Sequence, residues 1–184
     1  MTKVIAGMTV SLDGYVADRD GDAGALYPDL ADLRGSAYMD DMIEETGAVL
    51  MGRRTFEMAD PDHYVGNYEF QVPIFVLMSE PPRTAPAQDE RLTFTFVTDG
   101  AESAVAQAAA AAGEKAVTVV GGPGLIGELL GAALIDELRV DVMPALLGGG
   151  VRFLEGVDPE GIRLQKMGID DVGERTSLRF RVLA

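Results

Sequence analysis

The sequence contains no cysteine and only one histidine, His63, among its 184 residues. The absence of cysteine excludes disulfide bonds, thiolate metal sites and cysteine nucleophiles. A single histidine makes a multi-histidine metal site or a serine–histidine triad difficult to build. We therefore expect chemistry that needs no metal, and the composition fits the reducing environment of a cytoplasmic protein.

Positive charge is also scarce, because 15 lysines and arginines face 30 aspartates and glutamates and leave a net charge of -15. Such a chain repels the phosphates of nucleic acids and of anionic membranes, and no cluster of basic residues offers a local exception. The apolar run at residues 4–10 is too short for a membrane span. The expected partner is a small-molecule substrate, with no nucleic acid and no membrane.

Apolar runs and helix-like stretches alternate along the chain. Strands are expected at residues 4–10, 48–51, 74–78, 92–98, 116–120, 137–143, 162–169 and 176–183, and helices at 33–46, from about 55, at 101–112 and at 125–134. This order predicts a single α/β domain over residues 1–184, with helices on both faces of a mixed, mostly parallel central sheet and an antiparallel hairpin at its C-terminal edge. Ligands are expected at the carboxyl ends of the strands.

The first motif with chemical meaning is Gly52-Arg53-Arg54-Thr55, where a buried strand gives way to a helix. Glycine lets the backbone approach a ligand, free N–H groups open the helix, and arginine offers a planar fork to a phosphate. The motif predicts an anion site. Taken alone, it also fits an ordinary turn with solvated arginines.

A second glycine-rich loop, Gly121-Gly122-Pro123-Gly124-Leu125, again follows a buried strand and opens a helix. Its glycines allow a pyrophosphate to approach the chain, with the helix dipole behind the amides. It departs from the usual dinucleotide fingerprint because Pro123 interrupts the pattern. A tight glycine turn with no ligand is the alternative.

The order of these two loops, with Ser-Leu-Asp-Gly at 11–14 ahead of them, resembles the reductase domain of riboflavin biosynthesis and, more distantly, dihydrofolate reductase. Further matching segments lie at 136–138 and 144–150, and the resemblance covers nearly the whole chain. It implies a three-layer dihydrofolate reductase-like fold, NADPH as cofactor and a homodimer. It also implies that Arg53 and Thr55 contact the cofactor phosphates, that residues 121–125 cradle the pyrophosphate, and that Ser79 lies near the phosphate of the adenosine ribose.

The chain is similar to stand-alone deaminase-reductase domain proteins, and its substrate stays open. Where the riboflavin reductase carries a lysine before Ser-Leu-Asp-Gly and an acid before Gly-Gly, this chain has Gly7 and Val120. The position of the acid that holds the pterin in dihydrofolate reductase falls near Ser36.

Asp13 is the first candidate for a proton relay or a substrate hydrogen bond, although Asp-Gly is also a common turn pair. Asp40, Asp41, His63 or water are the other possible proton donors. The aromatic segment 60–70 either covers the substrate or only packs.

The predicted function is that of an NADPH-dependent oxidoreductase, which transfers hydride to a small heterocyclic or sugar-amine-like substrate. A non-catalytic nucleotide or small-molecule binding protein on the same fold is the alternative, because a fold does not determine a function. A reductase that uses flavin is a third possibility, which the phosphate argument for Arg53 disfavours.

Overall fold

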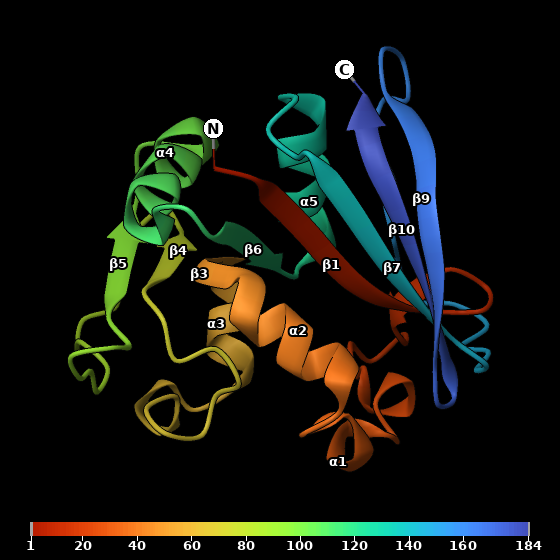
Figure 1. The fold of residues 1–184 in the computed structure, drawn as a ribbon, viewed down its shortest axis with the longest axis horizontal. Helices are drawn as coiled ribbons and strands as arrows, with labels where there is room; N and C mark the ends of the chain where they lie inside the picture. Colours follow the sequence, from red (N-terminus) through yellow and green to blue (C-terminus); the bar gives the residue numbers. More distant parts are fainter. Residues whose placement is uncertain (1, 184) are drawn as a thin grey trace.

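The computed structural model describes residues 2–183 and shows an eight-stranded sheet with helices on both faces (Figure 1). The strands lie in the order β5-β4-β3-β6-β1-β7-β10-β9. The pairs from β5 to β7 are parallel, whereas β10 runs antiparallel to both β7 and β9. The predicted mixed, mostly parallel sheet with a C-terminal antiparallel hairpin is therefore confirmed.

The bounds of the strands follow the apolar runs of the sequence. They are β1 Val4–Ser11, β2 Tyr15–Ala17, β3 Thr46–Gly52, β4 Ile74–Leu77, β5 Phe94–Val97, β6 Ala116–Val120, β7 Glu137–Met143, β8 Val151–Arg152, β9 Arg163–Val172 and β10 Arg175–Leu183. The short strands β2 and β8 pair with each other as a separate antiparallel ribbon, which the sequence pattern did not predict.

The helices are α1 Leu30–Leu33, α2 Ala37–Glu45, α3 Arg53–Met58, α4 Ala101–Ala112 and α5 Pro123–Gly131, with 3-10 turns at Gly24–Leu26 and Pro61–His63. The helix expected at 33–46 is present as α2, but it begins at residue 37, because the chain breaks between α1 and α2. Gly35 there has a φ of +75°, and the Ser36 hydroxyl accepts a hydrogen bond from the Met39 amide and caps α2. The cap explains why the helix begins at residue 37.

Alternating residues of the central strands supply two cores. Ala48 and Leu50 of β3 pack with α4 and α5, whereas Val49 and Met51 point to the opposite face and pack with Phe56 of α3. The alanines of α4 at 101, 104, 108 and 112 are all buried, so this helix lies close to the sheet. The structure is therefore three-layered.

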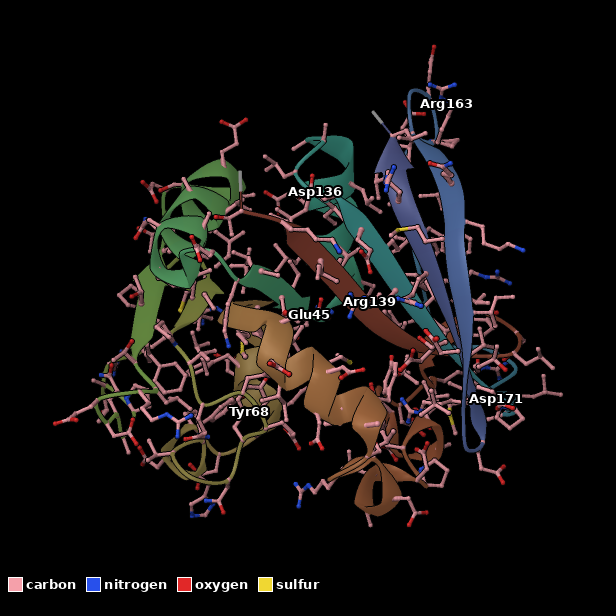
Figure 2. All side chains as sticks on the ribbon, in the orientation of Figure 1. Glu45, Tyr68, Asp136, Arg139, Arg163 and Asp171 are labelled. Atoms are coloured by element: carbon pink, nitrogen blue, oxygen red, sulfur yellow. The ribbon has the colours of Figure 1, made fainter. Side chains whose placement is uncertain are left out.

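The carboxyl ends of β3, β6 and β1 lie at one edge of the sheet because these strands are parallel neighbours. At the amino ends of the strands, the Asp136 carboxylate accepts a hydrogen bond of 2.8 Å from the Val4 amide and fixes the start of β1 (Figure 2). In the part of the chain that the structure describes, no helix has both the length and the apolar character needed to cross a membrane.

Candidate functional site

The two predicted glycine loops lie against each other at the carboxyl edge of the sheet. Leu50 of β3 is in register with Val119 of β6, so Gly52, the last residue of β3, and Gly121, the residue after β6, lie at neighbouring strand ends. A Cβ atom added to Gly121 would lie 3.1 Å from the Thr55 hydroxyl oxygen. A Cβ atom added to Gly52 would lie 3.9 Å from the Leu125 Cβ. The loops therefore form one surface, as a ligand that spans both requires.

The two glycines of the second loop have different conformations. Gly121 has a φ of +54°, which side chains rarely adopt, whereas Gly122 has a φ of -85°. The left-handed residue of this loop is therefore Gly121, and Gly122 has an extended backbone that any residue can adopt. The peptide bond between them is cis. A Cβ atom on Gly122 would meet only the Thr55 hydroxyl, at 3.7 Å, so the free loop has room for a methyl group there.

Arg53 extends from the start of α3 toward the end of β4. Its guanidinium donates a hydrogen bond of 2.7 Å to the carbonyl of Glu80, the residue after the exposed Ser79. It also forms a weak ion pair of 3.4 Å with Glu57. The structure thus brings Arg53 close to the chain at Ser79, as the cofactor assignment of both residues requires.

Arg54 points to a different place, a cavity of about 550 Å³ beside α5. The cavity begins at Pro123 and Gly124 and continues along α5. Its lining residues are Arg54, Pro123, Gly124, Gly127, Glu128, Gly131, Val151, Arg152, Glu155, Gly156, Val157 and Asp158. The side chains of the two adjacent arginines therefore lie at two different places on the surface.

Asp13 connects two loops that are far apart in the sequence. Its carboxylate accepts hydrogen bonds from the Ser11 hydroxyl at 2.6 Å, the Leu147 amide at 3.1 Å and the Gly148 amide at 2.7 Å. These bonds, that of Ser11 above all, lower the pKa of Asp13 from 3.8 to about 2. An acid with this pKa holds no proton near neutrality. The geometry therefore favours the turn-forming role over the proton relay.

The other candidate proton donors lie away from the glycine loops. The His63 side chain is 78% exposed and lies 3.7 Å from the Asp60 carboxylate. In the same segment, Tyr64 and Phe70 are buried with Phe56, so the segment packs on the core. Asp40 is exposed on α2, and Asp41 borders a second cavity described next.

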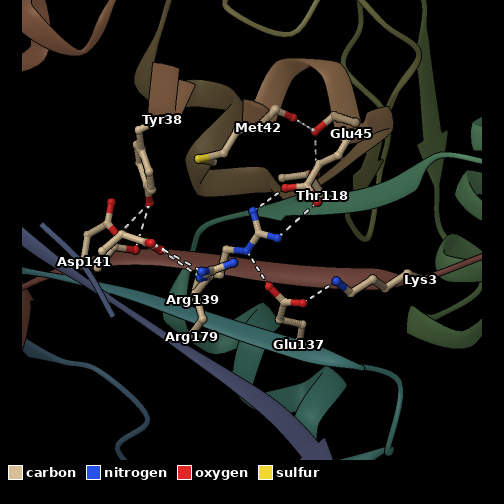
Figure 3. A network of polar contacts seen from close by, with 12 residues as sticks. Lys3, Tyr38, Met42, Glu45, Thr118, Glu137, Arg139, Asp141 and Arg179 are labelled. Carbon is tan, nitrogen blue, oxygen red and sulfur yellow. Dashed lines mark hydrogen bonds and ion pairs between the residues drawn. The ribbon is translucent and has the colours of Figure 1, made fainter. Parts of the chain in front are cut away.

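A polar layer fills the space between α2 and strands β7 and β10 (Figure 3). Arg139 binds both Glu137, at 2.6 Å, and the carboxylate of Glu45, and Glu137 also pairs with Lys3. A cavity of about 390 Å³ adjoins this layer, lined by Tyr38, Asp41, Met42, Glu45, Arg139, Asp170, Asp171, Val172 and Arg179. Because both arginines of this cavity already have carboxylate partners, the layer offers no free arginine to an anion.

A second cluster in the same layer holds the segment before α2. Arg175 is 2% exposed and binds the Asp29 carboxylate through two hydrogen bonds of 2.8 and 2.6 Å. It also contacts Asp141 at 3.0 Å, and Asp141 accepts a hydrogen bond of 2.8 Å from the Tyr38 hydroxyl. Sequence reasoning missed these residues, although Glu137, Arg139 and Asp141 alternate along β7, a pattern that indicates a polar face.

Sequence reasoning also missed Arg152 and the segment that follows it along the first cavity. The available signal was an arginine two residues after three consecutive glycines, in a chain with few basic residues. Among residues 2–183, histidine and acidic side chains form no group of three that could hold a metal ion.

The sheet order, the hairpin and the paired glycine loops define the dihydrofolate reductase-like class of folds. The family model of the RibD C-terminal domain matches residues 2–178, and the chain belongs to this family. It is 26% identical over 178 residues to the uncharacterized protein YwjB of Bacillus subtilis (strain 168), with 97% of each chain covered.

Two solved structures show the same fold. A putative riboflavin biosynthesis protein from Shewanella sp. PV-4 has a TM-score of 0.75 and 22% identity, and 99% of each chain is covered. Dihydrofolate reductase from Enterococcus faecalis, complexed with NADP(H), has a TM-score of 0.62 and 17% identity over 98% of this chain and 96% of the other.

Proposed function

We propose that this protein is an NADPH-dependent reductase that acts on a small heterocyclic or sugar-amine-like substrate. The contact between the two glycine loops, with Arg53 beside the chain at Ser79, carries the proposal. Membership of the RibD C-terminal domain family supports a reductase-type function, and the NADP(H) complex of the structurally similar dihydrofolate reductase supports a nicotinamide cofactor.

The residues present fit a dinucleotide phosphate. Gly121 and Gly122 leave the surface beside Thr55 free of side chains, and a Cβ on Gly124 would have no neighbour within 4 Å. We assign the 2′-phosphate to Arg53 with Ser79, and the pyrophosphate to Arg54, Thr55 and residues 121–125. The cofactor would supply the hydride when bound.

Gly7 marks the proposed place of the substrate. It is paired with Val120 in the sheet, next to the Gly121 loop, and a Cβ added to it would meet nothing within 4 Å. A small molecule above Gly7 would lie beside the end of β6. Because Asp13 is ionised near neutrality and His63 is largely exposed on another segment, we propose that water delivers the proton.

Cofactor turnover tests this function. The protein is mixed with NADPH and a panel of pterins, pyrimidinones, deazaflavin precursors and phosphorylated sugar amines, and the loss of absorbance of NADPH is followed. We expect oxidation with at least one member of the panel. Failure to bind NADPH at all would reject the proposal.

A non-catalytic nucleotide-binding protein is the second candidate. The observation in its favour is that neither Asp13 nor His63 is placed to donate a proton at the glycine loops. Tight binding of NADPH, with no oxidation beyond the rate in buffer for any substrate of the panel, would support this candidate over the reductase.

A further inference from the structure

Arg152 lines the cavity that Arg54 enters, from the opposite segment of the chain. Both side chains are exposed, and among residues 2–183 neither forms an ion pair with a carboxylate. Two arginine side chains without a carboxylate partner therefore line the same cavity. Together they attract an anion.

The backbone holds Arg152 at the same edge of the sheet as the two glycine loops. Arg152 is paired with Tyr15 in the β2–β8 ribbon, and the next amide, of Phe153, donates a hydrogen bond of 3.1 Å to the Gly14 carbonyl. Gly14 follows the carboxyl end of β1, as Pro123 follows that of β6. Arg152 is thus anchored at the end of the sheet where α5 begins, and both line the same cavity.

The side chain of Arg152 is also oriented. Its guanidinium carbon lies 4.9 Å from the centre of the Tyr15 ring, within the range of a cation–π interaction. The turn before β8 is closely packed, since a Cβ added to Gly150 would lie 2.2 Å from the Ala17 carbonyl. Asp13 fixes the same turn through the amides of Leu147 and Gly148.

Glu128 and Val157, the neighbour of Asp158, lie farther along α5 than Pro123. Glu128 is five residues after Pro123, about 7.5 Å along the helix axis at 1.5 Å per residue. Val157, between Glu155 and Asp158 in the chain, lies beside Gly127, since a Cβ added there would be 2.9 Å from a methyl carbon of Val157. An anion is therefore favoured at the start of α5, between the two arginines, and disfavoured at the far end of the cavity.

We propose that Arg152 is a further phosphate-binding residue, which closes over the pyrophosphate of the cofactor from the side opposite Arg54. This inference rests on the proposed function. Arg53 is directed to the Glu80 carbonyl and serves the 2′-phosphate, so Arg152 contacts a group that NADPH and NADH share. Substitution of Arg152 should therefore lower the affinity for NADPH and for NADH by the same factor.

The test is a calorimetric titration of Arg152→Ala with NADPH and with NADH. We expect the Kd of both cofactors to rise about tenfold, the scale of one charged hydrogen bond. Arg163→Ala is the matched control, an exposed arginine at the opposite end of the sheet, and should change neither (Figure 2). Because Arg152 is exposed, the melting temperature should stay unchanged.

Three results would overturn the assignment. Unchanged affinity for both cofactors would remove Arg152 from the site, and a loss for NADPH alone would place it at the 2′-phosphate. If both affinities are unchanged and the KM of phosphorylated substrates rises relative to unphosphorylated ones, the phosphate belongs to the substrate. Failure of the unmodified protein to bind either cofactor would reject the proposed function itself, so the two failures are distinguishable.

Tyr15 gives an independent test of how Arg152 is positioned. The Arg152 guanidinium also donates a long hydrogen bond of 3.4 Å to the Tyr15 hydroxyl. Tyr15→Phe removes this bond but keeps the aromatic ring and should retain cofactor affinity, whereas Tyr15→Leu should raise the Kd about threefold. In the Arg152→Ala background, Tyr15→Leu should have no additional effect on the Kd. An equal effect of Tyr15→Leu in both backgrounds would show that the ring does not act through Arg152.

Discussion

Thr55 and Gly121 belong to loops after different strands, yet the Thr55 hydroxyl lies 3.1 Å from the position of a Cβ atom on Gly121. This contact joins the two predicted phosphate loops into one surface. It also makes Gly121 a sensitive position, because its φ of +54° disfavours any side chain.

The two glycines of this loop should respond differently to alanine. Gly121→Ala combines backbone strain with a close contact and should lower the free energy of unfolding by about 1–2 kcal/mol. Gly122→Ala fits the free loop and should leave unfolding almost unchanged, but its methyl group should obstruct the cofactor. Melting temperature and NADPH affinity, measured for both variants, check this. A stable Gly122→Ala variant with unaltered affinity would mean that no phosphate approaches this loop.

Arg53 should determine the preference for NADPH over NADH. Arg53→Ala should reduce the binding free energy of NADPH by about 1–2 kcal/mol, which is the lower part of the range for a charged hydrogen bond. The lower part applies because the Arg53 side chain is 43% exposed. The affinity for NADH should stay almost unchanged. Arg54→Ala is the matched control and should weaken the binding of both cofactors, since Arg54 lines the cavity beside α5, where we place the pyrophosphate. An equal loss for both cofactors in Arg53→Ala would contradict the assignment.

Asp13 should make stability depend on pH in the acid range. Its folded-state pKa of about 2 lies below the ordinary value of 3.8, so its ionised form stabilises the fold. This contribution is present above about pH 4 and is lost as the pH falls toward 2. Asp13→Asn should be less stable than the unmodified protein at pH 7, and the difference should shrink at pH 2. Urea unfolding at several pH values measures it.

The control for Asp13 is Asp20→Asn, an exposed aspartate in the turn after β2. It should lower stability less than Asp13→Asn at pH 7, because Asp13 accepts three hydrogen bonds that connect two loops. Equal effects of the two substitutions would show that these bonds contribute little.

We propose that the sheet edge at β9 (Arg163–Val172) forms the contact between two subunits of a homodimer. Leu164, Met167 and Ile169 on this edge strand are 47%, 44% and 56% exposed. An unpaired edge with apolar side chains favours association. Ile169→Glu should therefore shift the protein from dimer to monomer in sedimentation, whereas Met58→Glu, at an exposed methionine of α3, should not. A monomer in the unmodified protein at micromolar concentration would reject the dimer.

The sequence predicted the elements whose signal is local. The apolar run of β6 and the alanine-rich α4 have the expected bounds, Ala116–Val120 and Ala101–Ala112. Both glycine loops were also predicted, because they follow apolar strands directly. The break at Gly35 was missed, since a serine cap and a glycine outside the apolar pattern give a weak signal.

The parts that depend on distant pairing could not be predicted. Strands β2 and β8 have three and two residues, too few to show an alternating pattern, and each is a strand only through its pairing with the other. The structural role of Asp13 likewise depends on amides at 147 and 148. The cavity that holds Arg152 follows from the same pairing.

The central place of β1 has a consequence for the order in which the chain can fold. Val4 pairs with Val117 of β6, and Ile5 pairs with Glu137 of β7, so both neighbours of β1 come more than a hundred residues later in the chain. During synthesis, β1 therefore leaves the ribosome without either partner, and its apolar side chains remain unpaired until β6 and β7 follow. Contacts of such long sequence separation slow folding and extend the time during which apolar segments are exposed to aggregation.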